Sequence, residues 1–529
     1  MSCLAHFTPL FKSTKRISQG AVSSESQRQR YVSLSSLCLF ASRANLAHEG
    51  NSSYTTSIHV LDDDSLLNIF HLYRVFPLGG SRDIHTRLGG GMDWVGERWW
   101  YILAHVCQRW RNLILGSATY LGLCLVCTYG TPVADMLTHS PPLPLVIDYR
   151  GPTCIAEDEE AIILALAQRD RVRRIRFVIP VLCLQKLIQL IDGEYPILEY
   201  LILADRSTVK STLLALPETL EIPRLRHLTI NGSIPIRLQL LTTAVTSLVT
   251  LHLALHHLST YFQPNVLLQS LSLMPQLEVL LIKFCFAVPN RDVERQLMRT
   301  PMAVTHVTLP NLRFFEIEAG SIYSEAVLGR ITASHLENLL IFYPNEFTFS
   351  VPELVQFIGR TAKLRFNRTW IKFDSDQVYV NVFPHEPETT ATVAAFAMGI
   401  LCWHLDWQVS SVAQIFNAIS QISSAVEHLT LAHEYHSLSS EEHNEVDRTE
   451  WRKLLRSFNN VKTLHVRDGL IRDLTHCLRL EDGEDSLELL PELQKLTYPA
   501  RDNANDEFTS FIDARQNAGR PVTLIKSQY

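Results

Sequence analysis

A short phrase of apolar residues recurs along most of the chain and restricts the folds that it can adopt. In each copy, two residues separate a first apolar residue from a second, and one residue separates the second from a third. The copies begin at Leu198, Leu225, Leu248, Leu277, Leu312, Leu336, Val426, Val461 and Leu493. Neighbouring copies start 23 to 35 residues apart, except for one interval of 90, and Leu accounts for 78 of the 529 residues. This regularity excludes disorder of the whole chain and indicates a repeat architecture.

Helical patterns lie between these phrases, for example at 184–191 and 451–458. A strand and a helix in every repeat of this length is a lengthened form of the leucine-rich repeat layout. A single unit cannot bury its Leu face, so the units stack. We therefore predict an α/β fold in which residues 140–529 form a leucine-rich-repeat-like solenoid, with parallel strands inside and helices outside. The competing interpretation is an ordinary α/β sheet, whose buried strands also read as apolar runs.

The residues between the apolar positions of each phrase are expected on the opposite, concave face, because strand side chains alternate in direction. That face would be neutral to mildly polar, which suits a protein ligand better than a phosphate backbone. The candidate substrate-binding residues are Tyr200, His227, Thr229, His252, Lys283, Phe314, Glu316, His428 and His465. The alternative is a solvated inner face, with the ligand held on a loop.

Residues near 367–400 fit the repeat poorly. The segments that start at Trp370 and Gln377 alternate like the two strands of a hairpin. We predict an irregular insertion there.

Residues 57–125 have a helical pattern of their own. Asp62 to Asp64 form an acidic helix start, and Gly116 is a plausible end for a second helix that begins near Arg98. A Gly-rich loop separates the two helices. Two short helices cannot build a core alone, so we expect this unit to pack on the rest of the chain or on another protein.

The strings Leu67-x-Ile69-Phe70 and Val106-Cys107-x-x-Trp110-x-x-Leu113 resemble the F-box. The resemblance implies a three-helix unit that docks on the Skp-type adaptor of cullin–RING ubiquitin ligases. The adaptor-binding residues that it implies are Leu61, Leu66, Leu67, Ile69, Phe70, Val106, Cys107, Trp110 and Leu113. From about residue 58 to the C-terminus, the chain is similar to the F-box proteins that mushroom-forming (basidiomycete) fungi carry in large families.

The chain departs from the F-box pattern in three places. Asp62 follows Leu61 where the family has Leu-Pro, and Tyr120-Leu121 replaces the usual final Leu-Trp. A Gly-rich insertion also lengthens the motif. These departures favour a second interpretation, in which the chain is a repeat scaffold that does not bind the ligase.

Charge and cysteine usage narrow the class of protein further. The net charge is −6, and we see no basic face of the kind that nucleic-acid binders carry. No run of 18 apolar residues predicts a transmembrane helix. The ten cysteines are scattered, which suits a reducing compartment and a cytoplasmic or nuclear protein. Residues 1–56, rich in Ser and poor in acidic residues, are expected to be a disordered tail; a transit peptide is the alternative.

No catalytic motif stands out. Cys124 and Cys127 form a lone C-x-x-C without the second pair that a zinc site needs, so we interpret them as buried structural cysteines. His433 and His436 do not have the spacing of a metalloprotease pair. We therefore predict no enzyme activity, metal or cofactor.

The combined prediction is a substrate-recruiting subunit of a cullin–RING ubiquitin ligase. Its partners would be the Skp-type adaptor, the cullin and an unknown protein substrate, and neither nucleic acid nor membrane. The alternative is the repeat scaffold without ligase binding, and an enzyme is a third, unsupported possibility.

Overall fold

The computed structural model describes residues 61–75, 97–205, 216–232, 245–285, 306–344, 348–361, 366–384, 394–433, 448–467, 469–479, 487–499 and 508–527, together with residues 292, 294, 346 and 364. The chain divides into two compact units, Met1–Leu66 and Leu67–Tyr529. Only residues 61–66 of the first unit are described, so the expected tail at 1–56 lies outside the described residues.

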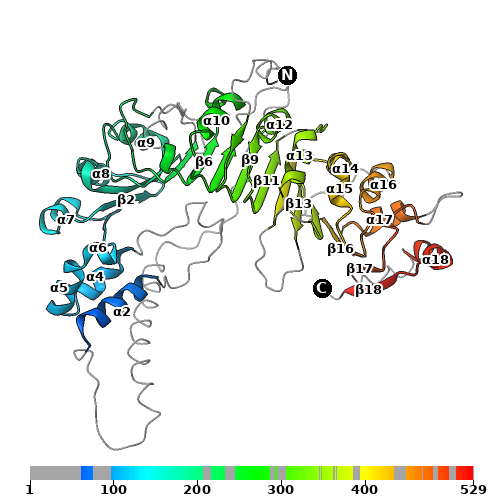
Figure 1. Cartoon of the computed structure of the whole chain (residues 1–529), viewed down its shortest axis with the longest axis horizontal. Coiled ribbons are helices and arrows are strands. Elements are labelled where there is room, and N and C mark those ends of the chain that lie inside the picture. Colours follow the sequence, from blue (N-terminus) through cyan, green and yellow to red (C-terminus); the bar gives the residue numbers. More distant parts are fainter. Residues whose placement is uncertain are drawn as a thin grey trace, which may run out of the picture. The chain divides into compact units, whose positions relative to one another are not determined.

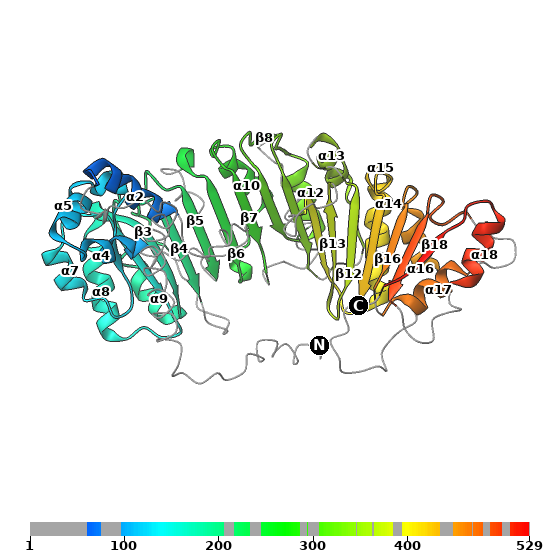
Figure 2. The same cartoon turned by 90° about the horizontal axis from the view of Figure 1, so that it is seen from below.

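One long sheet organises the second unit (Figures 1 and 2). Its described strands run in the order β1-β2-β3-β4-β5-β6-β7-β9-β11-β14-β13-β12-β15-β16-β17-β18. The strands are β1 (Leu125–Cys127), β2 (Leu145–Arg150), β3 (Val172–Ile179), β4 (Tyr200–Asp205), β5 (His227–Gly232), β6 (Thr250–Leu255), β7 (Val279–Lys283), β9 (Phe314–Glu318), β11 (Asn338–Tyr343), β12 (Arg368–Phe373), β13 (Gln377–Phe383), β14 (Phe396–Leu401), β15 (His428–His433), β16 (Thr463–Val466), β17 (Lys495–Pro499) and β18 (Thr523–Ser527). The short strands β8 (Val307–Thr308) and β10 (Ile331–Thr332) form a separate parallel pair.

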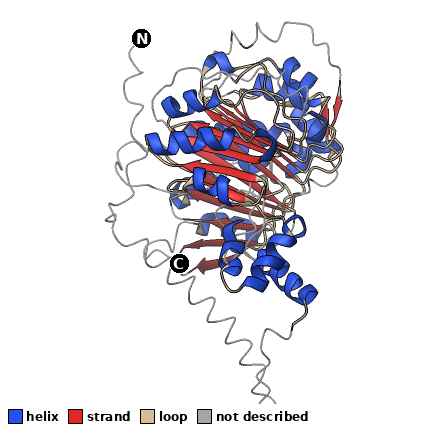
Figure 3. Cartoon of the chain, turned by 90° about the vertical axis from the view of Figure 1, so that its left-hand side faces the viewer, coloured by secondary structure: helices blue, strands red, loops and turns tan. Residues whose placement is uncertain are grey.

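Helices follow most strands and lie along one side of the sheet; Figure 3 marks them in blue beside the red strands. They are α7 (Val133–His139), α8 (Ala156–Leu166), α9 (Val181–Ile188), α10 (Pro264–Leu271), α12 (Ser321–Leu328), α13 (Pro352–Arg360), α14 (Leu405–Ala418), α15 (Ser420–Ser423), α16 (Arg448–Arg456), α17 (Ile471–Leu478) and α18 (Thr509–Asn517). Within the described part of the chain, no helix is both long and apolar enough to cross a membrane.

All nine apolar phrases coincide with strands of this sheet, and the strands pair in parallel with their neighbours outside the β13 region. The apolar triplets fill the space between the sheet and the helices. In β4, for example, Leu201 and Leu203 are buried while Tyr200 and Ile202 are half-buried. The prediction of an α/β fold with parallel strands backed by helices is confirmed.

Residues 367–400 include the predicted hairpin, which interrupts the parallel order of the repeat and yet belongs to the main sheet. Strands β12 and β13 pair antiparallel, with Arg368 opposite Phe383 and Phe373 opposite Val378. Strand β13 also pairs with β14, and β12 pairs in parallel with β15. The hairpin is therefore part of the main sheet, because its alternating apolar side chains continue the same buried layer.

The helical unit before the sheet contains α2 (Asp63–Val75), α4 (Trp99–Ala104), α5 (Gln108–Gly116) and α6 (Ala118–Leu121). The backbone amide of Ser65 donates to the Asp62 carboxylate at 2.7 Å, so Asp62 caps the start of α2. The second helix, predicted to begin near Arg98 and to end at Gly116, is in fact two helices, because residues 105–107 are not helical. Cys107 has an extended backbone, and its sulfur accepts a hydrogen bond from the Trp110 amide, which starts α5 as a new helix.

Helix α4 covers the exposed edge of the sheet. Strand β1 is the first described strand of the sheet, so its outward carbonyls have no partner among the described strands. The Trp100 indole N–H donates to the Cys124 carbonyl at 3.2 Å, and the Arg98 guanidinium donates to the Val126 carbonyl at 2.8 Å. Side chains from the helical unit therefore satisfy edge groups that would otherwise invite pairing with another chain.

Candidate interaction surfaces

The helical unit has an interior of aromatic rings. Phe70 of α2 meets Trp110 of α5 edge to face, with ring centroids 5.0 Å apart, and both are buried. Tyr73 contacts Trp99 at 6.2 Å, and His71 contacts Tyr120 at 5.6 Å. These contacts hold α2 against α4, α5 and α6.

Large apolar side chains remain exposed on the same helices. We group them under the name helical apolar surface: Ile69 and Leu72 on α2, Ile102 on α4, Val106 in the turn before α5 and Tyr120 on α6, with exposures of 43 to 57%. Several exposed apolar side chains on one small unit can provide a protein-binding surface.

The nine residues expected to contact the adaptor separate into three groups. Ile69 and Val106 lie on the helical apolar surface. Leu61, Leu67, Cys107 and Leu113 are half-buried. Leu66, Phe70 and Trp110 are buried, so these three side chains are not open contacts in the described structure. Helical spacing predicts which apolar residues share one face of a helix. It does not show whether that face points into a small helical unit or away from it.

The second candidate surface is the strand face, which we define by the strand side chains that alternate with the buried triplets. The parallel register places these side chains in rows across the sheet. One row contains Tyr200, His227, Thr250, Val279 and Phe314. The next row contains Ile202, Thr229, His252, Leu281 and Glu316. Lys283 lies in the following row, opposite Glu318. The sheet therefore brings seven of the nine predicted substrate-binding residues, from Tyr200 to Glu316, onto one face, and His428 and His465 lie on its continuation.

Near the helical unit, the strand face carries a stacked group. The Tyr200 and His227 rings lie 4.1 Å apart, and the Arg174 guanidinium lies 4.8 Å from the Tyr200 ring centre. Arg174 also forms an ion pair with Glu97. Burial, together with the charges of Arg226 and Arg174, lowers the pKa of His227 to about 4, so this His is neutral at pH 7. The group is a packed aromatic and cationic cluster.

The middle of the strand face has acidic character. Lys283 pairs with Glu316 at 2.5 Å, and Glu318 lies directly across from Lys283 on β9. Burial raises the pKa of Glu318, while Lys283 opposes that shift. Phe314 is almost completely buried, so it supports this part of the face more than it presents an open contact.

The far part of the strand face is basic and aromatic. The register aligns Arg368 with His428, Thr463 and Lys495, and aligns Trp370 with Thr430 and His465. Sequence reasoning missed Arg368 and Trp370 because they were assigned to an insertion. The alternation of the two hairpin strands was the signal that could have placed them in the sheet.

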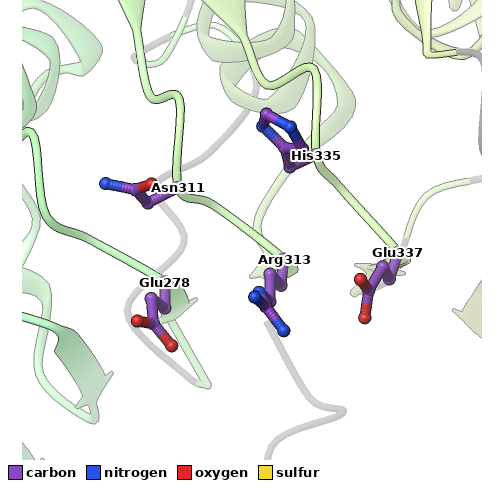
Figure 4. A pocket seen from close by; sticks show the side chains of 5 residues that line it. All are labelled: Glu278, Asn311, Arg313, His335 and Glu337. Atoms are coloured by element: carbon purple, nitrogen blue, oxygen red, sulfur yellow. The ribbon is translucent and has the colours of Figure 1, made fainter.

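A shallow polar hollow of about 190 Å³ lies at the edge where the strands begin (Figure 4). Glu278, Arg313 and Glu337 immediately precede β7, β9 and β11, and Figure 4 shows Arg313 between the two carboxylates. Exposed alternating charges of this kind contribute little binding energy. We therefore interpret the hollow as a group of charged side chains at the edge of the sheet and not as a ligand site.

The two cysteines of the C-x-x-C string are buried. Burial raises the pKa of Cys124, and it raises the pKa of Cys127 to about 12, so both remain thiols at neutral pH. Among the described residues, no group of three or more His, Cys, Asp or Glu side chains is arranged to hold a metal ion.

Comparisons with known proteins yield a weak likeness to a solved repeat structure. No protein-family model matches the chain. No curated protein matches it. Among solved structures, it is similar to the leucine-rich repeat-containing protein LegL7 of Legionella pneumophila, with 12% identity and a TM-score of 0.24, over 76% of this chain and 99% of that chain. The repeat architecture itself is established by this chain's own strand order and register.

Proposed function

We propose that this chain is the substrate-recruiting subunit of a cullin–RING (SCF-type) ubiquitin ligase. In this proposal the helical unit binds the Skp-type adaptor, and the strand face binds a protein substrate. The observation that carries the proposal is the helical apolar surface on a unit whose interior is already filled by Phe70 and Trp110. Its apolar side chains are exposed and can pack on a partner, as helix-binding grooves require.

The proposed role requires no chemistry from this chain. A recruiting subunit acts by holding a substrate near a separate transferring enzyme, which raises the effective concentration of the reacting groups. The contacts of Arg98 with β1 and of Trp100 with Cys124, just before β1, support such a role, because they join the helical unit to the sheet through buried or half-buried hydrogen bonds. Asp62 caps α2, so the departure from Leu-Pro still leaves a defined helix start.

The test is a pull-down of the full chain with a Skp-type adaptor. The double variant Ile69→Asp/Val106→Asp places two charges on the helical apolar surface and should abolish binding. Leu182→Asp is the matched control, because Leu182 is 69% exposed but lies on α9, away from the helical unit. Failure of the wild-type chain to bind would leave the alternative, a repeat scaffold without a ligase. Equal binding by wild type and double variant would show that another surface contacts the adaptor.

A further inference from the structure

We propose that the far part of the strand face binds an extended segment rich in Asp and Glu on the recruited protein. The surface, which we call the basic strand patch, comprises Arg368, Trp370, His465, Arg467 and Lys495. This inference rests on the proposed function in one respect: it takes the bound protein to be the substrate that the ligase recruits. Binding itself is a property of this surface and is tested without the ligase.

The sheet register gathers these side chains from segments far apart in the sequence. Arg368 on β12 lies in one row with Lys495 on β17, and three strand spacings separate them. Arg467 continues the alternation of β16 beyond His465, and its amide donates to the Leu431 carbonyl at 2.8 Å. At about 4.8 Å per strand spacing, the row from β12 to β17 spans roughly 14 Å, the length of four or five extended residues.

The cations of this patch are not neutralised by described carboxylates. Arg368, Arg467 and Lys495 form no ion pair within the described ranges, and two carboxylates that flank β12 and β15 contact other lysines. Asp374 lies 3.7 Å from Lys372, and Glu427 pairs with Lys462 at 2.8 Å. The pKa of His465 reflects the same crowding, since burial lowers it first, followed by the charges of Arg467, Arg368 and Lys495. An anionic partner would relieve this repulsion.

An aromatic ring adds a contact for an apolar side chain next to the acidic residues. The Arg467 guanidinium lies 5.6 Å from the centre of the Trp370 ring, a cation–π contact that holds both groups on the patch. Trp and Arg residues are among the types that contribute most to protein interfaces. The patch therefore offers both charge and packing to a peptide.

A protein segment fits this patch better than a nucleic acid does. The basic character is local, because Glu316 and Glu318 lie on the same face farther along the sheet. The whole chain carries a net charge of −6. A nucleic-acid backbone extending from the patch would meet those carboxylates, whereas an acidic segment of a few residues would not.

The experiment measures binding of a fluorescein-labelled peptide to the purified full chain by fluorescence anisotropy. The peptide has about eight residues, enough to cover the four or five that the patch spans and to extend past both of its ends. The peptide alternates Glu with Ala and carries one central Leu, and its counterpart replaces every Glu with Gln. There are two further probes. One is the same peptide with phosphoserine in place of Glu, and the other is a short single-stranded oligonucleotide. The test variant is Arg368→Gln/Arg467→Gln/Lys495→Gln.

The matched control is Lys186→Gln/Arg360→Gln/Arg520→Gln, which removes the same charge outside the strand face. We expect the Glu peptide to bind wild type and control within about twofold of each other. The reference is the affinity of the Glu peptide for wild type. We expect the Glu peptide to bind the test variant at least about tenfold more weakly, and the Gln peptide to bind wild type at least about tenfold more weakly. Thermal unfolding should show that all three proteins are folded.

Several results would overturn the proposal: absence of binding to wild type, an equal loss in the control, no loss in the test variant, or tighter binding of the phosphoserine peptide or the oligonucleotide. The adaptor pull-down is independent of this result. A test variant that loses peptide binding while still binding the adaptor separates failure of the patch from failure of the ligase role.

Discussion

The rings of Tyr200 and His227 stack across neighbouring strands, with centroids 4.1 Å apart and planes inclined by only 11°. The Nδ1 atom of His227 also lies 3.0 Å from the Thr250 hydroxyl oxygen. Tyr200, His227 and Thr250 lie far apart in the sequence. The parallel register of β4, β5 and β6 places them next to one another. This cluster shows that part of the strand face is packed as firmly as a core.

Lowering the pH should reduce the free energy of unfolding because of His227. Its pKa in the folded chain is about 4, below the ordinary value of 6.5, because burial disfavours the charged ring. Between these two values the unfolded chain binds a proton that the folded chain does not, so the free energy of unfolding falls as pH decreases. We expect His227→Gln to lessen this loss by about 1–3 kcal/mol between pH 7 and pH 4, measured by urea unfolding. The exposed His335→Gln is the control, and identical pH dependence in all three proteins would contradict the assignment.

Replacing Trp100 should test the covered sheet edge. Trp100→Phe keeps an aromatic ring but removes the donor to the Cys124 carbonyl, leaving a buried acceptor without its partner. The expected cost is about 1–3 kcal/mol of unfolding free energy, measured by chemical denaturation. Trp403→Phe changes a half-exposed indole and should cost less than about 0.5 kcal/mol. Equal effects of the two substitutions would show that the edge hydrogen bond contributes nothing.

The two sides of α2 should respond differently to truncation. Phe70→Ala empties the space against Trp110 and should cost about 3–5 kcal/mol. Ile69→Ala shortens a side chain that is 43% exposed and should cost less than about 1 kcal/mol. Denaturant unfolding of the full chain measures both values. A large loss for Ile69→Ala would mean that the helical apolar surface is covered within the chain itself.

The pair formed by Arg176 and Asp148 is completely buried and bonded through two nitrogens, Nε at 2.8 Å and a terminal nitrogen at 2.5 Å. Arg176→Ala should therefore cost about 3–5 kcal/mol, because it leaves a buried carboxylate with less compensation. The double variant Arg176→Met/Asp148→Leu should recover most of that loss. Equilibrium unfolding of Arg176→Met, Asp148→Leu and the double variant gives the coupling energy. Purely additive losses would contradict a direct interaction.

Much of the architecture was predictable because the determining signal is local. The spacing of Leu201, Leu203 and their counterparts follows the two-residue period of a strand, so each phrase located its own strand. The same period predicted which residues, such as Tyr200 and His227, would share the strand face. Outside the β12–β14 segment, strand order followed from chain order in a stacked repeat.

The place of the hairpin in the sheet could not be predicted from local spacing. Its alternation was visible, but its position between β14 and β15 depends on pairing with distant strands: Arg368 aligns with His428, which lies 60 residues later in the chain. Pairing at such separation is decided by the whole sheet and not by local propensity. Arg368 and Trp370 were missed for this reason.

The sequence by itself determined the repeat, the parallel sheet with its helices, and the residue types on each face, because these depend on periodicity within a few residues. Only the tertiary structure decided that Phe70 and Trp110 are interior while Ile69 and Val106 are exposed, and that Arg368, Arg467 and Lys495 form one patch. Those outcomes depend on which elements pack against each other, and burial and charge clustering are properties of neighbours in space.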